Sequence, residues 1–275
     1  MTQINKLSNI LMQFCDIDIS KYDISFLKKS VQKRMAETCS GSVVEYNALL
    51  GQNYGERRAF IDSLQISYSE FFRNPLTFAV LERIILPALV LKKKKANGKE
   101  IRIWSAACAE GQEAYSLAIL LEELKNGDMD QFSYRIFATD QSDAQVNEAS
   151  KGQYSSAALN NVSLKRAGEW FTSQGDIYTV KPGLQKNIEF STFDLFNEEF
   201  SCPPSSIFGS FDLVVCANLL FYYTDEHRKL LLAKTGNCLA DGGYLFTGET
   251  ERNIVMRCNY QEVYPQAAIF KRNRQ

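Results

Sequence analysis

The stretch Ile101-Arg-Ile-Trp-Ser-Ala-Ala-Cys-Ala-Glu-Gly-Gln-Glu113 contains the change of pattern that decides the fold. It opens with a short apolar segment, Ile101 to Trp104, passes through a loop of small residues, and leads into a helix predicted over 113–124. After it, apolar strands are predicted at 134–139, 188–191, 211–217 and 243–248, and helices at 144–150 and 225–239. Strands that alternate with helices in this way are typical of an α/β fold with a doubly wound, mostly parallel sheet.

The N-terminal residues have a helical pattern instead. Ile24, Leu27, Val31 and Met35 recur at helical spacing, which predicts an amphipathic helix. The remaining surface of this helix is basic and carries Lys28, Lys29, Lys33 and Arg34. Two interpretations stay open: a solvated face without a partner, or a local site for an acidic partner.

Three regions are predicted along the chain. Residues 1–75 form an N-terminal helical domain. Residues 76–275 form the sheet domain, whose first helix is expected over 78–91 because Pro75 suits a helix first turn. Residues 155–187 interrupt the alternation of strands and helices, which indicates a small inserted subdomain.

Composition narrows the class of protein. With 31 basic and 32 acidic side chains among 275 residues, the net charge is −1, which offers no global attraction for nucleic acid. Seven cysteines without a CxxC pair are expected to be reduced thiols. The start lacks a signal-peptide pattern, and no apolar run is long enough to cross a membrane, so a cytoplasmic protein is predicted. A single histidine, His227, argues against histidine triads and multi-histidine metal sites.

The loop after the first strand is where a ligand is expected, because an open parallel sheet binds ligands at the carboxyl ends of its strands. It has one glycine, Gly111, where a dinucleotide fingerprint has three, and its acids Glu110 and Glu113 would repel phosphate, which disfavours a nicotinamide-dependent oxidoreductase. Asp140 ends the second strand, where a carboxylate can accept both hydroxyls of a ribose. Together these features suggest S-adenosylmethionine, a nucleoside that carries an amino-acid cation. Taken singly, Glu113 could be a first-turn acid and Asp140 a helix N-cap.

Five co-linear motifs then resemble those of the CheR family, the chemotaxis receptor methyltransferases. They are Ser69-Glu-Phe-Phe-Arg73, Ile103 to Ala118, Ala138-Thr-Asp140, Gly152-Gln-Tyr154 and Phe211 to Tyr222, and the run Asp241 to Glu251 continues the pattern. The resemblance covers nearly the whole chain in the order of the family.

The resemblance implies a fold like that of class I S-adenosylmethionine-dependent methyltransferases. It implies methylation of glutamate side chains on the cytoplasmic part of chemoreceptors, with S-adenosylhomocysteine as the product. A monomer is expected, and the charge balance, the single histidine and the lack of a long apolar run predict that it binds no nucleic acid or metal and does not insert into membranes. The alternative is a catalytically inactive module that binds S-adenosylmethionine or a receptor.

Roles are carried over position by position. Arg73 and Tyr222 fall on the methyl-transfer positions. The cofactor positions fall on Ser67, Ser69, Arg73, Glu113, Asp140, Asp194, Leu195, Ala217 and Asn218. The basic helix with Lys28, Lys29, Lys33 and Arg34 corresponds to the one that docks the receptor. Gln112, Ala114 and Ala217 depart from the family pattern, and at Ala217 only a backbone contact is possible.

The chemistry needs no histidine. A glutamate side chain with a pKa of about 4.3 is already ionised at neutral pH, so methyl transfer to its oxygen requires no general base. In the inserted subdomain, the short turn Ser173-Gln-Gly-Asp176 lacks the extension with which some family members bind a receptor C-terminal peptide, so no such tether is expected.

Overall fold

The computed structural model describes residues 3–65, 68–95, 100–127 and 132–273. The chain divides into two compact units. One combines Met1–Ile66 with Phe221–Lys229, and the other combines Ser67–Leu220 with Leu230–Gln275. None of the helices in the described ranges is both long and apolar enough to cross a bilayer.

The first unit is built from helices α1 (Gln3–Cys15), α2 (Ile24–Glu37), α3 (Val43–Gln52) and α4 (Tyr54–Ser63). Polar residues fix the starts of three of them: the side chains of Asp23, Ser42 and Asn53 each accept a hydrogen bond from a backbone N–H in the first turn. Their apolar faces meet in a small core that includes Leu7, Leu11, Leu27, Val31, Tyr46, Leu50 and Phe60.

The second unit is organised by a seven-stranded sheet with the strand order β6-β2-β1-β7-β8-β10-β9. The strands are β1 (Glu100–Ala106), β2 (Ser133–Asp140), β6 (Ile188–Thr192), β7 (Phe211–Val215), β8 (Leu239–Phe246), β9 (Tyr260–Glu262) and β10 (Ile269–Arg272). The pairs from β6 to β8 are parallel, and β10 runs antiparallel to both of its neighbours. The prediction of a doubly wound, mostly parallel sheet is therefore confirmed.

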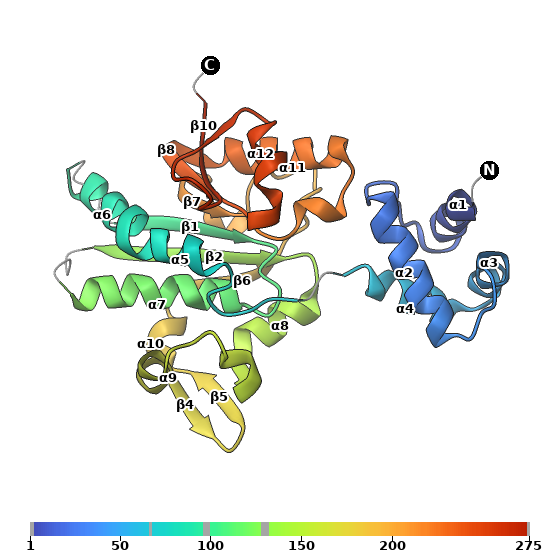
Figure 1. Ribbon diagram of the computed structural model, residues 1–275, viewed down its shortest axis with the longest axis horizontal. Coiled ribbons are helices and arrows are strands. Elements are labelled where there is room, and N and C mark those ends of the chain that lie inside the picture. The colour runs from blue at the N-terminus through green and yellow to red at the C-terminus, as the bar shows by residue number, and fades with distance from the viewer. Residues whose placement is uncertain (1–2, 66–67, 96–99, 128–131, 274–275) are drawn as a thin grey trace. The chain divides into compact units, whose positions relative to one another are not determined.

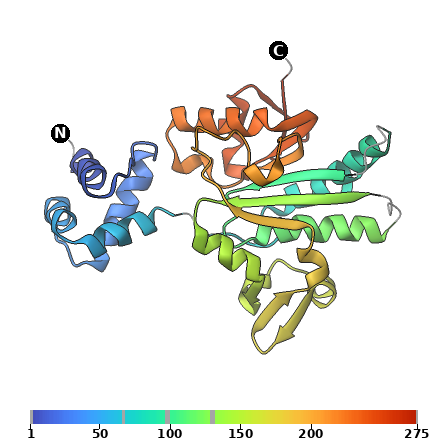
Figure 2. The ribbon, with the colours of Figure 1, turned by 180° about the vertical axis from the view of Figure 1, so that it is seen from behind.

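Helices cover both faces of this sheet (Figures 1 and 2). They include α5 (Pro75–Val80), α6 (Leu86–Lys95), α7 (Gln112–Asn126), α8 (Asp143–Lys151), α11 (Asp225–Asn237) and α12 (Arg252–Met256). Helices α5 to α7 pack on one face, in a core with alternate residues of the strands such as Ile103, Ile136 and Leu213. The other face buries Trp104, Phe137 and Phe211, whose rings contact one another.

The helix predicted over 78–91 is longer than expected and has a π-helical turn inside it, at Leu81–Ile85. Pro87 explains the turn, because it has no N–H and its ring would clash with the carbonyl four residues earlier in a regular α-helix. The chain widens just before it, and the N–H of Leu86 donates to the carbonyl of Leu81.

The inserted segment forms a three-stranded antiparallel sheet from β3 (Gln153–Ser155), β4 (Phe171–Gln174) and β5 (Ile177–Val180), with helices α9 (Leu164–Trp170) and α10 (Pro182–Gln185). The sequence pattern missed β3 and β4, because each is short and mostly polar. Gln174 pairs with Ile177, so the β4–β5 hairpin turns through two residues, with Gly175 at a positive φ of 60°.

Candidate active site

The strand order locates the site without reference to any motif. Strand β1 lies between β2 and β7. From β1 the strand order continues to β2 and β6 on one side and to β7 and β8 on the other, so the direction in which strands are added to the sheet reverses at β1. In such sheets the ligand crevice lies outside the carboxyl ends of the strands at this reversal point. The segments at these ends are residues 105–111, which comprise the last two residues of β1 and the loop that follows and are called the loop 105–111 below, and residues 216–220 after β7.

The loop 105–111 is held by its backbone and presents mainly small side chains. The N–H of Cys108 donates to the Thr139 carbonyl at 2.8 Å, and the N–H of Gly111 donates to the Cys108 carbonyl at 2.9 Å. Ala107 and Ala109 have positive φ values of 63° and 48°, which non-glycine residues rarely adopt. Such strain persists only where neighbouring contacts enforce it, and residues strained in this way cluster at active sites and ligand-binding loops.

Asp140 provides one of the contacts that hold this loop. Its carboxylate accepts the N–H of Ala109 at 3.0 Å through one oxygen and the N–H of Ser142 at 3.0 Å through the other. Asp140 is not the N-cap of α8, because that role belongs to the side chain of Ser142. Burial raises the pKa of Asp140, and the backbone donors work against this increase. Each oxygen still has a lone pair for a further hydroxyl donor.

Glu113 lies in the first turn of α7, on the other side of the same loop. It is partly buried and accepts a hydrogen bond from the Ser105 hydroxyl at 2.7 Å. The pKa of Glu113 is raised to about 7, mainly because the carboxyl group is buried. The Ser105 hydrogen bond and the charge of Arg73 oppose this increase, and the charge of Glu251 adds to it. A carboxyl group with this pKa changes charge within the physiological range.

The charge of Arg73 acts on Glu113, and the segment that carries Arg73 is attached to α7. The backbone N–H of Phe72 donates to the Ser116 hydroxyl at 3.0 Å, and Ser116 follows Glu113 by one helical turn. The guanidinium of Arg73 lies over the Tyr68 ring, 5.2 Å from its centroid. Ser69, in the same segment, is half-buried, and Ser67 lies outside the described residues.

The motif Gly152-Gln-Tyr154 supports the loop 105–111 through a hydrogen bond. Tyr154 donates its hydroxyl to the carbonyl of Glu110 at 2.6 Å, and its ring meets Phe71 edge-on at 4.9 Å. Gly152 ends α8 at a positive φ of 60°. One tyrosine thus joins the loop to the segment that carries Arg73.

The pair Asp194 and Leu195 also reaches this edge of the sheet. The preceding residue, Phe193, donates its N–H to the Asp140 carbonyl at 2.9 Å. Leu195 is buried, and Asp194 is exposed and accepts the N–H of Phe196. Asp194 and Leu195 therefore come directly after a residue whose backbone is hydrogen-bonded to that of Asp140.

Glu251 is a site residue that the sequence reading missed. It is fully buried, and its carboxylate accepts the N–H groups of Asn218 at 2.8 Å, Leu220 at 2.6 Å and Gly248 at 2.8 Å. These bonds hold the turn after β7, in which Asn218 has a positive φ of 60° and Ala217 is half-exposed. The sequence offered one signal for Glu251: it ends the run Asp241 to Glu251, which includes the predicted strand 243–248.

The remaining predicted residues belong to the helical unit. Tyr222 lies there with residues 221–229, and Phe26 of α2 contacts its ring edge-on at 4.9 Å. Lys28, Lys29 and Lys33 are exposed on α2. Arg34 differs from these lysines: it points inward and pairs with Glu56 at 2.5 Å, and Glu56 also accepts the Tyr46 hydroxyl. Arg34 therefore stabilises the helical unit.

The carboxylates of the sheet unit fit S-adenosylmethionine. Two carboxylates, Glu113 and Asp140, flank a small-residue loop, and one suits an ammonium group while the other suits paired hydroxyls. Glu113 and the neighbouring Glu110 would repel the phosphates of a dinucleotide.

Comparisons with known proteins indicate the same cofactor. The family model described as "CheR methyltransferase, SAM binding domain" matches residues 67–267. A chemotaxis protein methyltransferase 1 of Pseudomonas aeruginosa is 33% identical over 226 residues, which are 80% of this chain and 79% of that protein. A chemotaxis protein methyltransferase of Listeria monocytogenes is 35% identical over 70% of this chain and 68% of its own. A third, from Borreliella burgdorferi, is 28% identical over 98% and 94% of the two chains. The chain therefore belongs to the CheR family of S-adenosylmethionine-dependent chemotaxis methyltransferases.

Proposed function

We propose that this enzyme transfers a methyl group to glutamate side chains in the cytoplasmic helical region of chemoreceptors, and that it does so in the cytoplasm as a monomer. The observation that carries the proposal is the joint placement of Glu113, Asp140 and Arg73 around the loop 105–111. Asp140 would bind the ribose hydroxyls, Glu113 the ammonium group, and Asp194 and Leu195 would flank the adenine. Ser67, Ser69, Ala217 and Asn218 would line the rest of the cofactor site.

When bound, S-adenosylmethionine supplies a methyl group on a positively charged sulfur. The residues of this chain then have to orient the substrate carboxylate and exclude water from it, and orientation of this kind can contribute roughly 7–11 kcal/mol in the best cases. The carboxylate loses its charge during the transfer, so a tight ion pair would favour the ground state over the transition state. We propose that Arg73 and Tyr222 act as hydrogen-bond donors that aim the carboxylate.

The direct test is methyl transfer. The protein, methyl-labelled S-adenosylmethionine and the cytoplasmic fragment of a coexpressed chemoreceptor should yield label that mild alkali releases as methanol. Replacing the receptor glutamates with aspartate should abolish it. A protein that binds S-adenosylhomocysteine and the receptor but forms no labile ester would be the inactive module instead.

Tyr222→Phe tests the methyl-transfer residue. Loss of a hydroxyl that donates to a charged group should lower kcat by about ten- to a hundredfold, while the Kd for S-adenosylmethionine stays within twofold. Unchanged turnover would remove Tyr222 from the mechanism.

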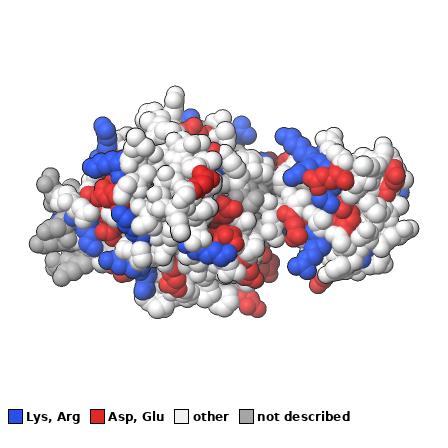
Figure 3. All heavy atoms as spheres, turned by 90° about the horizontal axis from the view of Figure 1, so that it is seen from below, with Lys and Arg blue, Asp and Glu red and all other residues white. Residues whose placement is uncertain are grey.

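The exposed lysines of α2 are proposed to dock the acidic receptor helix. Basic and acidic side chains are interspersed over the face shown in Figure 3. The net charge of the chain is −1, so the attraction is expected to be local. Lys29→Glu combined with Lys33→Glu should raise the receptor KM roughly tenfold at low salt, and the increase should shrink at high salt because the charges are screened. The double reversal Lys6→Glu with Arg58→Glu, on exposed positions of α1 and α4, changes the net charge equally and should leave KM unchanged. A KM increase that does not respond to salt would contradict docking by charge.

A further inference from the structure

Residues 221–228 are attached to the loop before α2 by their backbones. The N–H of Asp23 donates to the Tyr222 carbonyl at 2.8 Å, and the N–H of Thr224 donates to the Lys21 carbonyl at 3.0 Å. Together they form an antiparallel bridge between Tyr22 and Tyr223. This bridge fixes where the backbone of Tyr222 lies within the helical unit.

Aromatic rings complete the attachment. The Tyr22 and Tyr223 rings stack with their centroids 5.3 Å apart, and Phe26 lies 5.5 Å from Tyr22. Phe26 also presents its ring edge-on to Tyr222 at 4.9 Å, and Phe221 contacts the same ring at 4.3 Å. Phe221 precedes Tyr222 in the chain, whereas Phe26 is a contact that comes from another element, helix α2.

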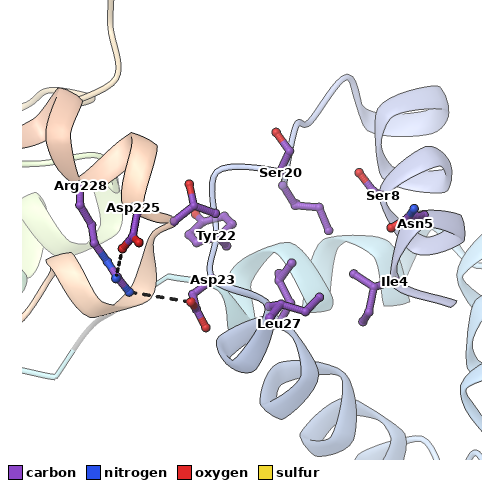
Figure 4. A pocket seen from close by; sticks show the side chains of 12 residues that line it. Ile4, Asn5, Ser8, Ser20, Tyr22, Asp23, Leu27, Asp225 and Arg228 are labelled. Atoms are coloured by element: carbon purple, nitrogen blue, oxygen red, sulfur yellow. Dashed lines mark hydrogen bonds and ion pairs between the residues drawn. The ribbon is translucent and has the colours of Figure 1, made fainter. Parts of the chain in front are cut away.

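The packing around this attachment is sparse on one side. A groove of about 500 Å³ lies between Ile4 and Ser8 of α1, Leu27 of α2 and Thr224 (Figure 4). Across its rim, Arg228 pairs with Asp225 at 2.6 Å and with Asp23 at 3.8 Å (Figure 4). The bridge, the rings and this ion pair are therefore among the contacts that attach residues 221–228, and Thr224, Asp225 and Arg228 border the groove.

Phe26 also connects Tyr222 to the lysines of α2. Residues 26, 29 and 33 are spaced by three and four, so Phe26, Lys29 and Lys33 form one stripe along the helix. We propose that Phe26 is a positioning residue that sets the ring of Tyr222 for methyl transfer and couples it to the helix that docks the receptor. This inference rests on the proposed role of Tyr222.

Phe26→Leu tests the coupling because it removes the ring and keeps an apolar side chain. We expect kcat to fall about three- to tenfold, the range that an aromatic pair contact supports, while the receptor KM and the Kd for S-adenosylmethionine change less than twofold. Phe26→Tyr retains the ring and should keep kcat near the original value. Phe60→Leu is the matched control: Phe60 is buried beside Tyr46 in the same unit, so this variant should lower the melting temperature and leave kcat of the folded enzyme unchanged.

A double-mutant cycle separates positioning from a general structural effect. In a Tyr222→Ala background, Phe26→Leu should have no further effect on kcat, because the ring that it positions is gone. An additional decrease of the same size in that background would overturn the proposal, as would unchanged kcat for Phe26→Leu alone. If Tyr222→Ala itself leaves kcat unchanged, the proposed role of Tyr222 fails, which is a distinct outcome.

Discussion

Glu113→Gln should weaken S-adenosylmethionine binding by about ten- to a hundredfold, as removal of one partner from a largely desolvated charge pair does. The variant keeps the size of the side chain and can still accept from the Ser105 hydroxyl, so the loop should keep its conformation. Calorimetry with S-adenosylhomocysteine, which retains the ammonium group, measures the effect. The matched control is Glu110→Gln, a change of the other acid in the same loop, which should alter the affinity less than twofold.

The pH dependence of binding gives a sharper form of this prediction. Because the pKa of Glu113 is raised to about 7, the carboxylate that binds the ammonium group is present above pH 7 and is lost as the pH falls. Affinity should therefore decrease by up to about tenfold per pH unit below 7, and Glu113→Gln should flatten the profile between about pH 5.5 and 7.5. An equally steep profile in the variant would assign the titration to another group.

The stability of the ligand-free protein should change in the opposite direction. The pKa of Glu113 in the folded state lies above its ordinary value of 4.5, so the folded protein favours the protonated form. The contribution of Glu113 is present below pH 4.5 and is lost as the pH rises through 7. In Glu113→Gln this decrease should disappear, which denaturant unfolding at several pH values can show.

Glu251→Gln should lower the free energy of unfolding by about 2–4 kcal/mol and weaken cofactor binding by about tenfold. The carboxylate accepts three backbone N–H groups, and a glutamine amide would direct its own N–H toward at least one of them. The backbone of Asn218 would then lose its support. Glu249→Gln, at an exposed position two residues earlier, is the matched control and should change the stability by less than about 0.5 kcal/mol.

Gly248→Ala disturbs the same turn by a different route. A Cβ at Gly248 would lie 2.8 Å from the Asn218 side-chain oxygen and 3.0 Å from Oε2 of Glu251. We expect Gly248→Ala to reduce cofactor affinity, as Glu251→Gln should. If both variants bind S-adenosylhomocysteine as tightly as the original protein, the turn after β7 is not part of the cofactor site.

Much of the fold could be predicted because its signals are local. Apolar runs identified the parallel strands, and helical periodicity identified α2 and α7. Pro87 shows the limit of periodicity: it leaves the helical pattern intact but changes the hydrogen bonding to a π-turn, which depends on backbone geometry. The short strands β3 and β4 have little apolar content and form because they pair with β5.

In the candidate site, too, some residues could be identified from the sequence and others could not. Glu113 and Asp140 could be identified from the sequence, because Asp140 ends an apolar strand and Glu113 lies in the first turn of the helix after another, and the carboxyl ends of both strands must lie at one edge of the sheet. The sequence could not separate Arg34 from the neighbouring lysines, since its inward position depends on Glu56, which lies 22 residues away.

By itself, then, the sequence determined the α/β fold, the loop after β1 and the two acids that are proposed to bind the cofactor. Tertiary structure alone decided that Glu251 supports the turn at Asn218, that Phe72 is bonded to Ser116, and that Tyr222 belongs with Phe26 in the helical unit. The physical reason is that these contacts join groups 33, 44 and 196 residues apart in the chain. Hydrogen bonds and ring contacts over such separations arise only when the chain folds, and they leave no period or spacing in the sequence.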